Sequence, residues 1–355
     1  MLVDCMFKTL ALSIFFAASA MAQQQPQFGE KLNVNLVLLD AVVTDSRGNQ
    51  ILGLDKDDFV VTENGSPQAI ESVDYFTNRQ LLTAPESKAS FKAERIRDER
   101  YFVLFFDKPN ETSFFGRLAV ARRAAADFID KQLKPGDRVG VVGHDVRLKV
   151  FSDFTTDKQQ LKRALDEAAT FSRGLQNAST APATGPSILR NIDLNRMIGG
   201  TGTVYEALEV LADSLRPIQA RKDVILFSAG IVEPGEEVRG GMVINTSRFY
   251  DPMIGALNRA DVSVYPVNLL DNPNQPPFVH QTLERIAHDT NGEYFRFNTN
   301  FAPALRRIEN ITNGYYLISY YTKKPQTERG FQKVDVAVKN RDFRIRARQG
   351  FSFGD

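Results

Sequence analysis

A regular alternation of apolar and amphipathic segments after residue 100 constrains the fold most strongly. The segment "YFVLFFD", residues 101–107, is continuously apolar up to its last residue, as in strands buried on both faces. The next segment, "FFGRLAVARRAAADFIDKQL", has apolar residues at helical spacing. Further strand-like segments, such as "RVGVVGHD" and "DVILFSAG", alternate with further helical ones. This pattern predicts an α/β domain with a doubly wound, mostly parallel sheet and helices on both faces.

Two β-rich segments flank the alternating region. The first carries the apolar run "VLLDAVV" and the hairpin signal "ENG", and the last strands alternate apolar and polar residues, as in "KVDVAVKN". A polar, charged segment lies between the first β-rich segment and the alternating region, and its composition is typical of a linker. We predict an N-terminal β module at 31–77, a linker at 78–99, the α/β domain at 100–313 and C-terminal strands at 314–355. One arrangement open to the terminal segments is a single β domain made from both ends of the chain.

The first 22 residues have the pattern of a signal peptide. Lys8 precedes the apolar run "TLALSIFFAASAMA", and small residues, Ala20 and Ala22, occupy the positions that a signal peptidase reads. The alternative is an uncleaved N-terminal anchor. The one cysteine, Cys5, lies in this segment, so no disulfide is expected in the mature chain. We predict an exported protein, periplasmic or secreted, whose mature chain has no membrane span.

Charge and motifs exclude several classes of function. The chain has 44 Lys and Arg against 43 Asp and Glu, a balance that argues against nucleic-acid binding. It contains no H-E-x-x-H, G-x-S-x-G or P-loop motif. A hydrolase triad of Ser228, His144 and Asp107 is conceivable at adjacent strand ends, but "FSAG" lacks a glycine-flanked elbow. We therefore predict a binding protein and not an enzyme.

Oxygen-donor side chains follow the strands at the edge where open α/β sheets bind ligands. Asp107 ends the first strand of the domain. The loop after it carries four more donors: Asn110, Glu111, Thr112 and Ser113. Thr201 and Thr203 lie in "GGTGT" at the start of a helix, where hydroxyls can bind a cation and backbone N–H groups an anion. The alternative is structural, with an aspartate that caps a strand end and a threonine that caps a helix.

The whole arrangement resembles the von Willebrand factor type A (VWFA) family, most closely the VWFA-related domain proteins described from Acidobacteria. The resemblance covers nearly the whole mature chain. It rests on "VLLDAVVTDSRGNQILGLDKDDFVVTENGSPQAIESV", "VLFFD", "LKPGDRVGVVGHDVRLKVFSDFTTDKQQLKRAL", "GGTGTVYEAL" and the tail from "NGYYLISYYT" to "RIRARQGF". It implies a Rossmann-like type A fold flanked by small β modules, with a role in protein–protein or adhesion-type interactions.

Type A domains carry a metal-ion-dependent adhesion site, and the resemblance places it in this chain. Its usual parts are D-x-S-x-S after the first strand, a threonine from a second loop and an aspartate from a "TDG"-like turn. Asp107 matches the first aspartate and Thr201 the threonine. Pro109 and Glu111 stand at the two serine positions, and Ala229 stands where the last aspartate would be. These departures make the site degenerate.

The resemblance implies Mg²⁺ as the one cofactor, held by Asp107, Glu111 and Thr201. An acidic side chain of a protein partner would complete the coordination. Five further residues are expected at the partner surface: Asn110, Thr112, Ser113, Thr203 and Ser228. The alternative is a metal-independent scaffold or assembly module of the cell envelope. The irregular stretch 172–198 should rim the same face, and its apolar residues either dock a partner or pack back onto the domain.

Overall fold

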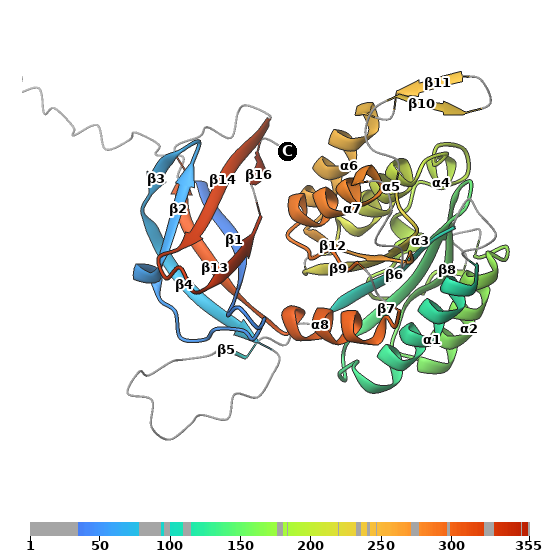
Figure 1. Cartoon of the computed structure of the whole chain (residues 1–355), viewed down its shortest axis with the longest axis horizontal. Coiled ribbons are helices and arrows are strands. Elements are labelled where there is room, and N and C mark those ends of the chain that lie inside the picture. The colour runs from blue at the N-terminus through green and yellow to red at the C-terminus, as the bar shows by residue number, and fades with distance from the viewer. Residues whose placement is uncertain are drawn as a thin grey trace, which may run out of the picture. The chain divides into compact units, whose positions relative to one another are not determined.

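The computed structural model in Figure 1 describes the terminal β strands and most of the α/β domain. The described residues are 35–77, 94–95, 100–108, 115–175, 180–182, 184–218, 220–231, 236–239, 242–245, 247–270, 277–296, 299–322, 330–348 and 350–353. The predicted signal peptide lies outside them, as does most of the predicted linker. Within the described residues, no helix combines the length and the apolar character needed to cross a membrane.

The α/β domain contains a five-stranded sheet with the order β12-β9-β6-β7-β8. The strands are β6 (Tyr101–Asp107), β7 (Arg138–His144), β8 (Leu148–Thr155), β9 (Lys222–Ser228) and β12 (Val262–Asn268). β8 pairs antiparallel with β7 at one edge, and the other pairings are parallel. The chain runs outward from β6 in one direction and then, from β9, in the other. This order is that of a doubly wound sheet, so the predicted fold class is confirmed.

Helices cover both faces of this sheet. The first core packs α5 (Val204–Leu215), α6 (Ser247–Arg259) and α7 (Pro277–Asp289) on one face, and the second packs α1 (Phe115–Lys131), α2 (Lys158–Thr170) and α8 (Ala302–Thr312) on the other. Within β6, Val103 and Phe105 belong to the first core, whereas Leu104 and Phe106 belong to the second. This double burial explains why the strand is apolar without alternation. A short hairpin of β10 (Glu236–Arg239) and β11 (Met242–Asn245) precedes α6.

The segment 172–198 is not the irregular loop that its composition predicts. It contains α3 (Ile188–Asn191) and α4 (Leu194–Gly199), which are capped by Ser187 and Asp193. Asp153 at the end of β8 accepts hydrogen bonds from the Ser187 hydroxyl and the Ile188 backbone N–H, at 2.6 and 2.8 Å. Ile188 and Met197 are buried in the first core. Of the two alternatives for its apolar residues, packing back onto the domain is confirmed, although Ile198 stays exposed.

The β strands from the two ends of the chain pair with one another. One sheet has the order β15-β1-β13-β4-β5, and the other the order β16-β14-β2-β3. Their strands are β1 (Asn35–Thr44), β2 (Phe59–Glu63), β3 (Ser66–Gln68), β4 (Ile70–Thr77), β5 (Glu94–Arg95), β13 (Gly314–Thr322), β14 (Gly330–Val338), β15 (Arg344–Ala347) and β16 (Gly350–Phe353), with a single 3₁₀ turn at Lys56–Asp58. β1 runs antiparallel to β13, and β2 to β14. A third core lies between the sheets, so the single β domain from both chain ends is confirmed.

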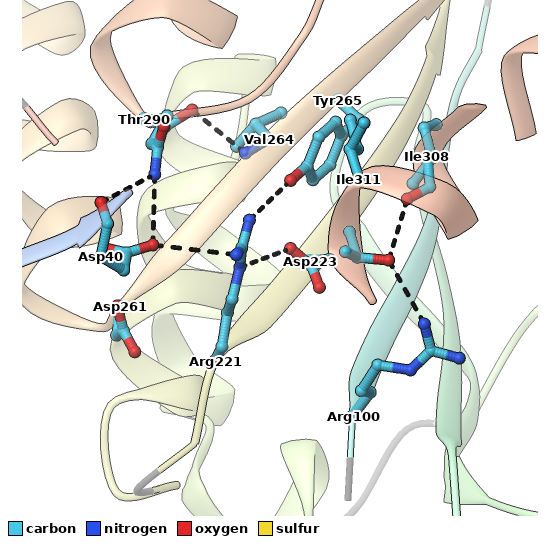
Figure 2. A network of polar contacts seen from close by, with 12 residues as sticks. Asp40, Arg100, Arg221, Asp223, Asp261, Val264, Tyr265, Thr290, Ile308 and Ile311 are labelled. Carbon is cyan, nitrogen blue, oxygen red and sulfur yellow. Dashed lines mark hydrogen bonds and ion pairs between the residues drawn. The ribbon is translucent and has the colours of Figure 1, made fainter. Parts of the chain in front are cut away.

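A buried network of charges ties β1 to the α/β domain, within one compact unit. Asp40 accepts hydrogen bonds from Arg348 Nε at 2.8 Å and from Asn291 Nδ2 at 3.1 Å. Figure 2 shows Arg221 reaching from the start of β9 toward Asp40, with 3.9 Å between Nη1 and Oδ2. Arg221 also contacts Asp223 of β9. Burial alone would raise the pKa of Asp40, but Arg348 and Arg221 outweigh it and lower the pKa.

Candidate functional site

Asp107 lies at the carboxyl end of β6 between residues from the two neighbouring strands. The Ser228 hydroxyl at the end of β9 donates a hydrogen bond to Asp107 Oδ2 at 2.7 Å. His144 at the end of β7 places Nδ1 3.5 Å from Asp107 Oδ1. The Asp107 side chain is 14% exposed. The parallel register of β6, β7 and β9 therefore brings three polar side chains together at one edge, with the carboxylate in the middle.

His144 links this cluster to the glycine-rich turn before α5. Its Nε2 lies 2.9 Å from the backbone carbonyl oxygen of Thr201. Because a carbonyl oxygen can only accept, we assign the ring proton to Nε2. In the neutral ring Nδ1 is then an acceptor and gives Asp107 no hydrogen bond, whereas a protonated ring would donate one. Among the described residues, Ser228 gives Asp107 the shorter of these two contacts.

Thr201 is almost fully buried, and its hydroxyl already has two partners. It donates to the Met197 carbonyl and accepts from the Leu148 N–H, each at 2.9 Å. Thr203 is the N-cap of α5, and its hydroxyl accepts from the Glu206 N–H in a capping box. The structural alternative of a helix cap is therefore confirmed for Thr203. For Thr201, the hydroxyl ties the turn before α5 to α4 and to the start of β8.

We expect Thr201→Val to lower the free energy of unfolding by about 1–3 kcal/mol, because it leaves the buried Leu148 N–H without its acceptor. Thr203→Val, which removes only a helix cap, should cost about 1 kcal/mol. Urea unfolding of both variants measures the difference. An unchanged stability for Thr201→Val would mean that the hydroxyl has no structural role and is available as a ligand.

The described residues do not by themselves form a cation site. Among them, no group of three or more His, Cys, Asp or Glu side chains is arranged to hold a metal ion. Asp107 contributes one carboxylate that Ser228 already contacts, and Ala229, where the type A pattern has an aspartate, has no ligand atom in its side chain. The loop residues Pro109, Asn110, Glu111, Thr112 and Ser113 lie outside the described residues. The assignment of Mg²⁺ to Asp107, Glu111 and Thr201 therefore stays a prediction.

The structure brings the three residues of the conceivable triad together, but in an order unsuited to nucleophilic catalysis. A triad needs the histidine between the serine and the carboxylate. Here Asp107 lies between Ser228 and His144, so the serine proton points at a carboxylate. Ser228 is also fully buried, and its oxygen accepts from the Gly230 N–H at 3.1 Å. Its burial likewise does not support the predicted contact of Ser228 with a partner.

A recess that the sequence analysis missed lies beside Thr201 at the same edge. We call it the basic recess, and its volume is about 330 Å³. Its lining residues are Arg147, Leu148, Lys149, Arg173, Leu175, Met197 and Ile198. The lining thus combines three cationic side chains with apolar ones, and Ile198, together with Val146 next to Arg147, is exposed, at 53% and 71%. The sequence signal was the alternation of basic and apolar residues in "VRLKV".

Comparisons with known proteins give distant similarities in structure. No family model and no curated protein matches the chain. An aerotolerance-related membrane protein of Bacteroides fragilis, with multiple mutations to serines, is 13% identical over 60% of this chain and 98% of its own, with a TM-score of 0.38. BatB of Bacteroides thetaiotaomicron is 16% identical over 60% and 96%, with a TM-score of 0.39. The vWF domain of the pilus tip protein Mfa5 of Porphyromonas gingivalis is 11% identical over 61% and 95%, with a TM-score of 0.40. Similarities this distant support no inference about function.

Proposed function

We propose that this chain is an exported binding protein that holds an acidic protein partner at the carboxyl-terminal edge of its sheet, without a resident metal ion. The observation that carries the proposal is the basic recess, which lies at the edge where open α/β sheets bind ligands. Export rests on the signal-peptide pattern of residues 1–22. A relation to the VWFA-related proteins of Acidobacteria is part of the proposal and rests on the quoted sequence segments.

The contacts of the polar cluster favour binding without metal. Asp107 is held by Ser228, and the Thr201 hydroxyl by Met197 and Leu148, so both side chains already have protein partners. The basic recess next to them offers cations instead. Arg147 is exposed, and Lys149, although paired with Asp145 at 2.7 Å, lines the same wall. Carboxylates of a partner would meet these side chains while its apolar residues cover Ile198.

The arrangement supports binding and not catalysis. Ser228, the one serine among the described residues of the cluster, is buried and donates to a carboxylate, and His144 Nε2 is hydrogen-bonded to a backbone carbonyl. Neither group is placed to activate a nucleophile or to transfer a proton to a substrate. The absence of enzymatic activity is therefore part of the proposal.

The proposal is tested with a fluorescent peptide that alternates Glu and Leu, and a matched peptide that alternates Gln and Leu. In the presence of a chelator, anisotropy should show saturable binding of the acidic peptide and none of the neutral one. Arg147→Glu should weaken the binding about tenfold, and added salt should weaken it further. Arg341→Glu, at an exposed turn after β14, is the matched control and should bind as the parent does.

Two outcomes would overturn the proposal. In the first, the acidic peptide binds only after Mg²⁺, Mn²⁺ or Ca²⁺ is added and not to Asp107→Ala, which would establish the metal-dependent alternative. Calorimetric titration of the three ions into the parent and into Asp107→Ala gives the same distinction without a peptide. In the second, neither peptide binds with or without metal, and the edge is then not a site for acidic partners.

A further inference from the structure

A second cavity lies at the junction of the β domain and the α/β domain, away from the proposed partner edge. We call it the junction cavity, and its volume is about 520 Å³. Residues of β1, β13 and β16 line it together with the start of β9 and the end of α6. Five of its lining side chains are cationic: Arg216, Arg221, Lys222, Arg259 and Arg348. Two are carboxylates, Asp40 and Asp261. The walls of the cavity thus carry an excess of positive charge.

Lys222, the first residue of β9, is the least expected of these cations. Its side chain is buried, with 1% of the residue exposed, and Nζ donates to the neutral carbonyl of Ile218 at 2.7 Å. In the described part of the chain, no carboxylate forms an ion pair with this ammonium group. Burial lowers the pKa of this ammonium group to about 8, and the nearby carboxylates Asp261 and Asp223 offset that effect only in part.

The two carboxylates of the cavity are engaged elsewhere. Asp40 accepts from Arg348 and Asn291, and Asp261 forms an ion pair with Arg348. Asp261 also raises the pKa of Lys222, but by less than burial lowers it. Arg259, at the end of α6, is exposed and adds a further cation at the rim. An anion that entered the cavity would meet an ammonium group whose charge the nearby carboxylates compensate only in part.

Apolar residues of the β domain also line the cavity and continue onto an exposed surface. Leu38, Leu317 and Phe351 line the cavity, and 54% of Leu38 is exposed. Side chains two residues apart on a strand share a face, so Leu36 lies beside Leu38 on β1. Leu36 pairs in register with Tyr321 of β13, and these two residues are 50% and 47% exposed. An apolar strip thus leads away from the cationic wall.

We propose that the junction cavity binds a small amphipathic anion, with its carboxylate or phosphate head at Lys222 and Arg259 and its apolar tail on Leu38, Leu317 and Phe351. The volume of the cavity suits a molecule of this size. Such a ligand contacts β1, β13 and β16 as well as β9 and α6, so it binds both domains at once. This site goes beyond the proposed function, because it is separate from the partner edge and takes a different class of ligand.

The experiment is a calorimetric titration of the full chain with four probes that differ in head and tail: octanoate, octyl phosphate, octanol and inorganic phosphate. We expect saturable binding of octanoate or octyl phosphate, and the stronger of the two identifies the head group. Octanol should not bind, and inorganic phosphate should bind more weakly because it lacks the tail. Lys222→Met and Arg259→Gln should each weaken the binding about tenfold.

Controls keep the result independent of folding and of the proposed function. Arg147→Gln removes a cation from the basic recess and should leave anion binding unchanged. The pKa of Lys222, followed by NMR after reductive methylation, should rise from about 8 when octyl phosphate is bound. Arg259 is exposed, so Arg259→Gln tests the site even if Lys222→Met does not fold. Equal binding of octanol, or unchanged binding by a folded Lys222→Met or by Arg259→Gln, would overturn the proposal, as would no saturable binding of either amphipathic anion.

Discussion

Arg100→Met is expected to lower the free energy of unfolding by about 3–5 kcal/mol, because it leaves a buried carboxylate without its counter-charge. Arg100 precedes β6 and meets Asp137 with two parallel hydrogen bonds, Nε to Oδ1 at 2.8 Å and Nη2 to Oδ2 at 2.5 Å. Both residues are buried. Arg100 Nη1 also donates to Asn313 Oδ1 at 3.0 Å, so one guanidinium ties the start of β6 to the chain just before β13.

The measurement is urea unfolding of the variant beside a matched surface pair. Arg122 and Asp166 also form an ion pair at 2.7 Å, but the two side chains are 34% and 63% exposed. Arg122→Met should therefore change the free energy of unfolding by no more than about 1 kcal/mol. The double variant Arg100→Met/Asp137→Leu should lose less free energy of unfolding than Arg100→Met alone, because it no longer contains the unpaired buried carboxylate. Equal losses for Arg100→Met and Arg122→Met would contradict this account of the buried pair.

Arg348→Met should destabilise the chain by a similar amount, about 3–5 kcal/mol, at the junction of the two domains. Arg348 is buried, donates to Asp40 and to the Asn258 carbonyl, and forms an ion pair with Asp261. Its removal leaves Asp40 with Asn291 at 3.1 Å and Arg221 at 3.9 Å. Arg344→Met, at the exposed start of the preceding strand β15, is the matched control and should change stability by about 0.5 kcal/mol or less.

The dependence of stability on acidic pH distinguishes the loss of the Arg348 charge from a loss of packing. The folded state lowers the pKa of Asp40 below its ordinary 3.8, so its contribution to stability is present above that value. The contribution is lost as the pH falls through the lower, folded pKa. Arg348→Met removes the main cause of the lowered pKa, so the variant should lose less stability than the parent over this acidic range. Parallel curves of stability against pH for the two proteins would assign the effect of Arg348 to packing alone.

The sequence predicted the parts of this fold that depend on local pattern. Continuous apolar segments identified the buried strands, and Asp107 was correctly placed at the edge of the sheet. Local pattern was less informative where elements are short. The helices α3 and α4 have only four and six residues, too few for a helical period, and their caps are ordinary loop residues by composition.

The candidate site depended on contacts that no local pattern contains. The basic recess needs residues 147–149, 173–175 and 197–198, which only the folded domain brings together. The resemblance to type A domains placed Ser228 at the partner surface, but in the structure its hydroxyl donates to Asp107 of the neighbouring strand β6. A close backbone contact after the end of α7 is another feature that no local pattern contains. Asn291 and not Gly292 takes the left-handed conformation, and Gly292 is required because a Cβ there would collide with the Val264 carbonyl.

The pairing of the first strand with strands near the end of the chain has a consequence for biogenesis. Asn35 pairs with Thr322, and Phe59 pairs with Val338. The strands β1 and β2 are therefore synthesised long before the strands with which they pair. The α/β domain between them is nearly continuous in sequence and can form while the chain is still growing. Until β13 and β14 emerge, β1 and β2 present unpaired backbone and apolar side chains, which invite association between nascent chains. The β domain is therefore completed late in synthesis, and a chain that ended before β14 would leave β2 without one of its pairing partners.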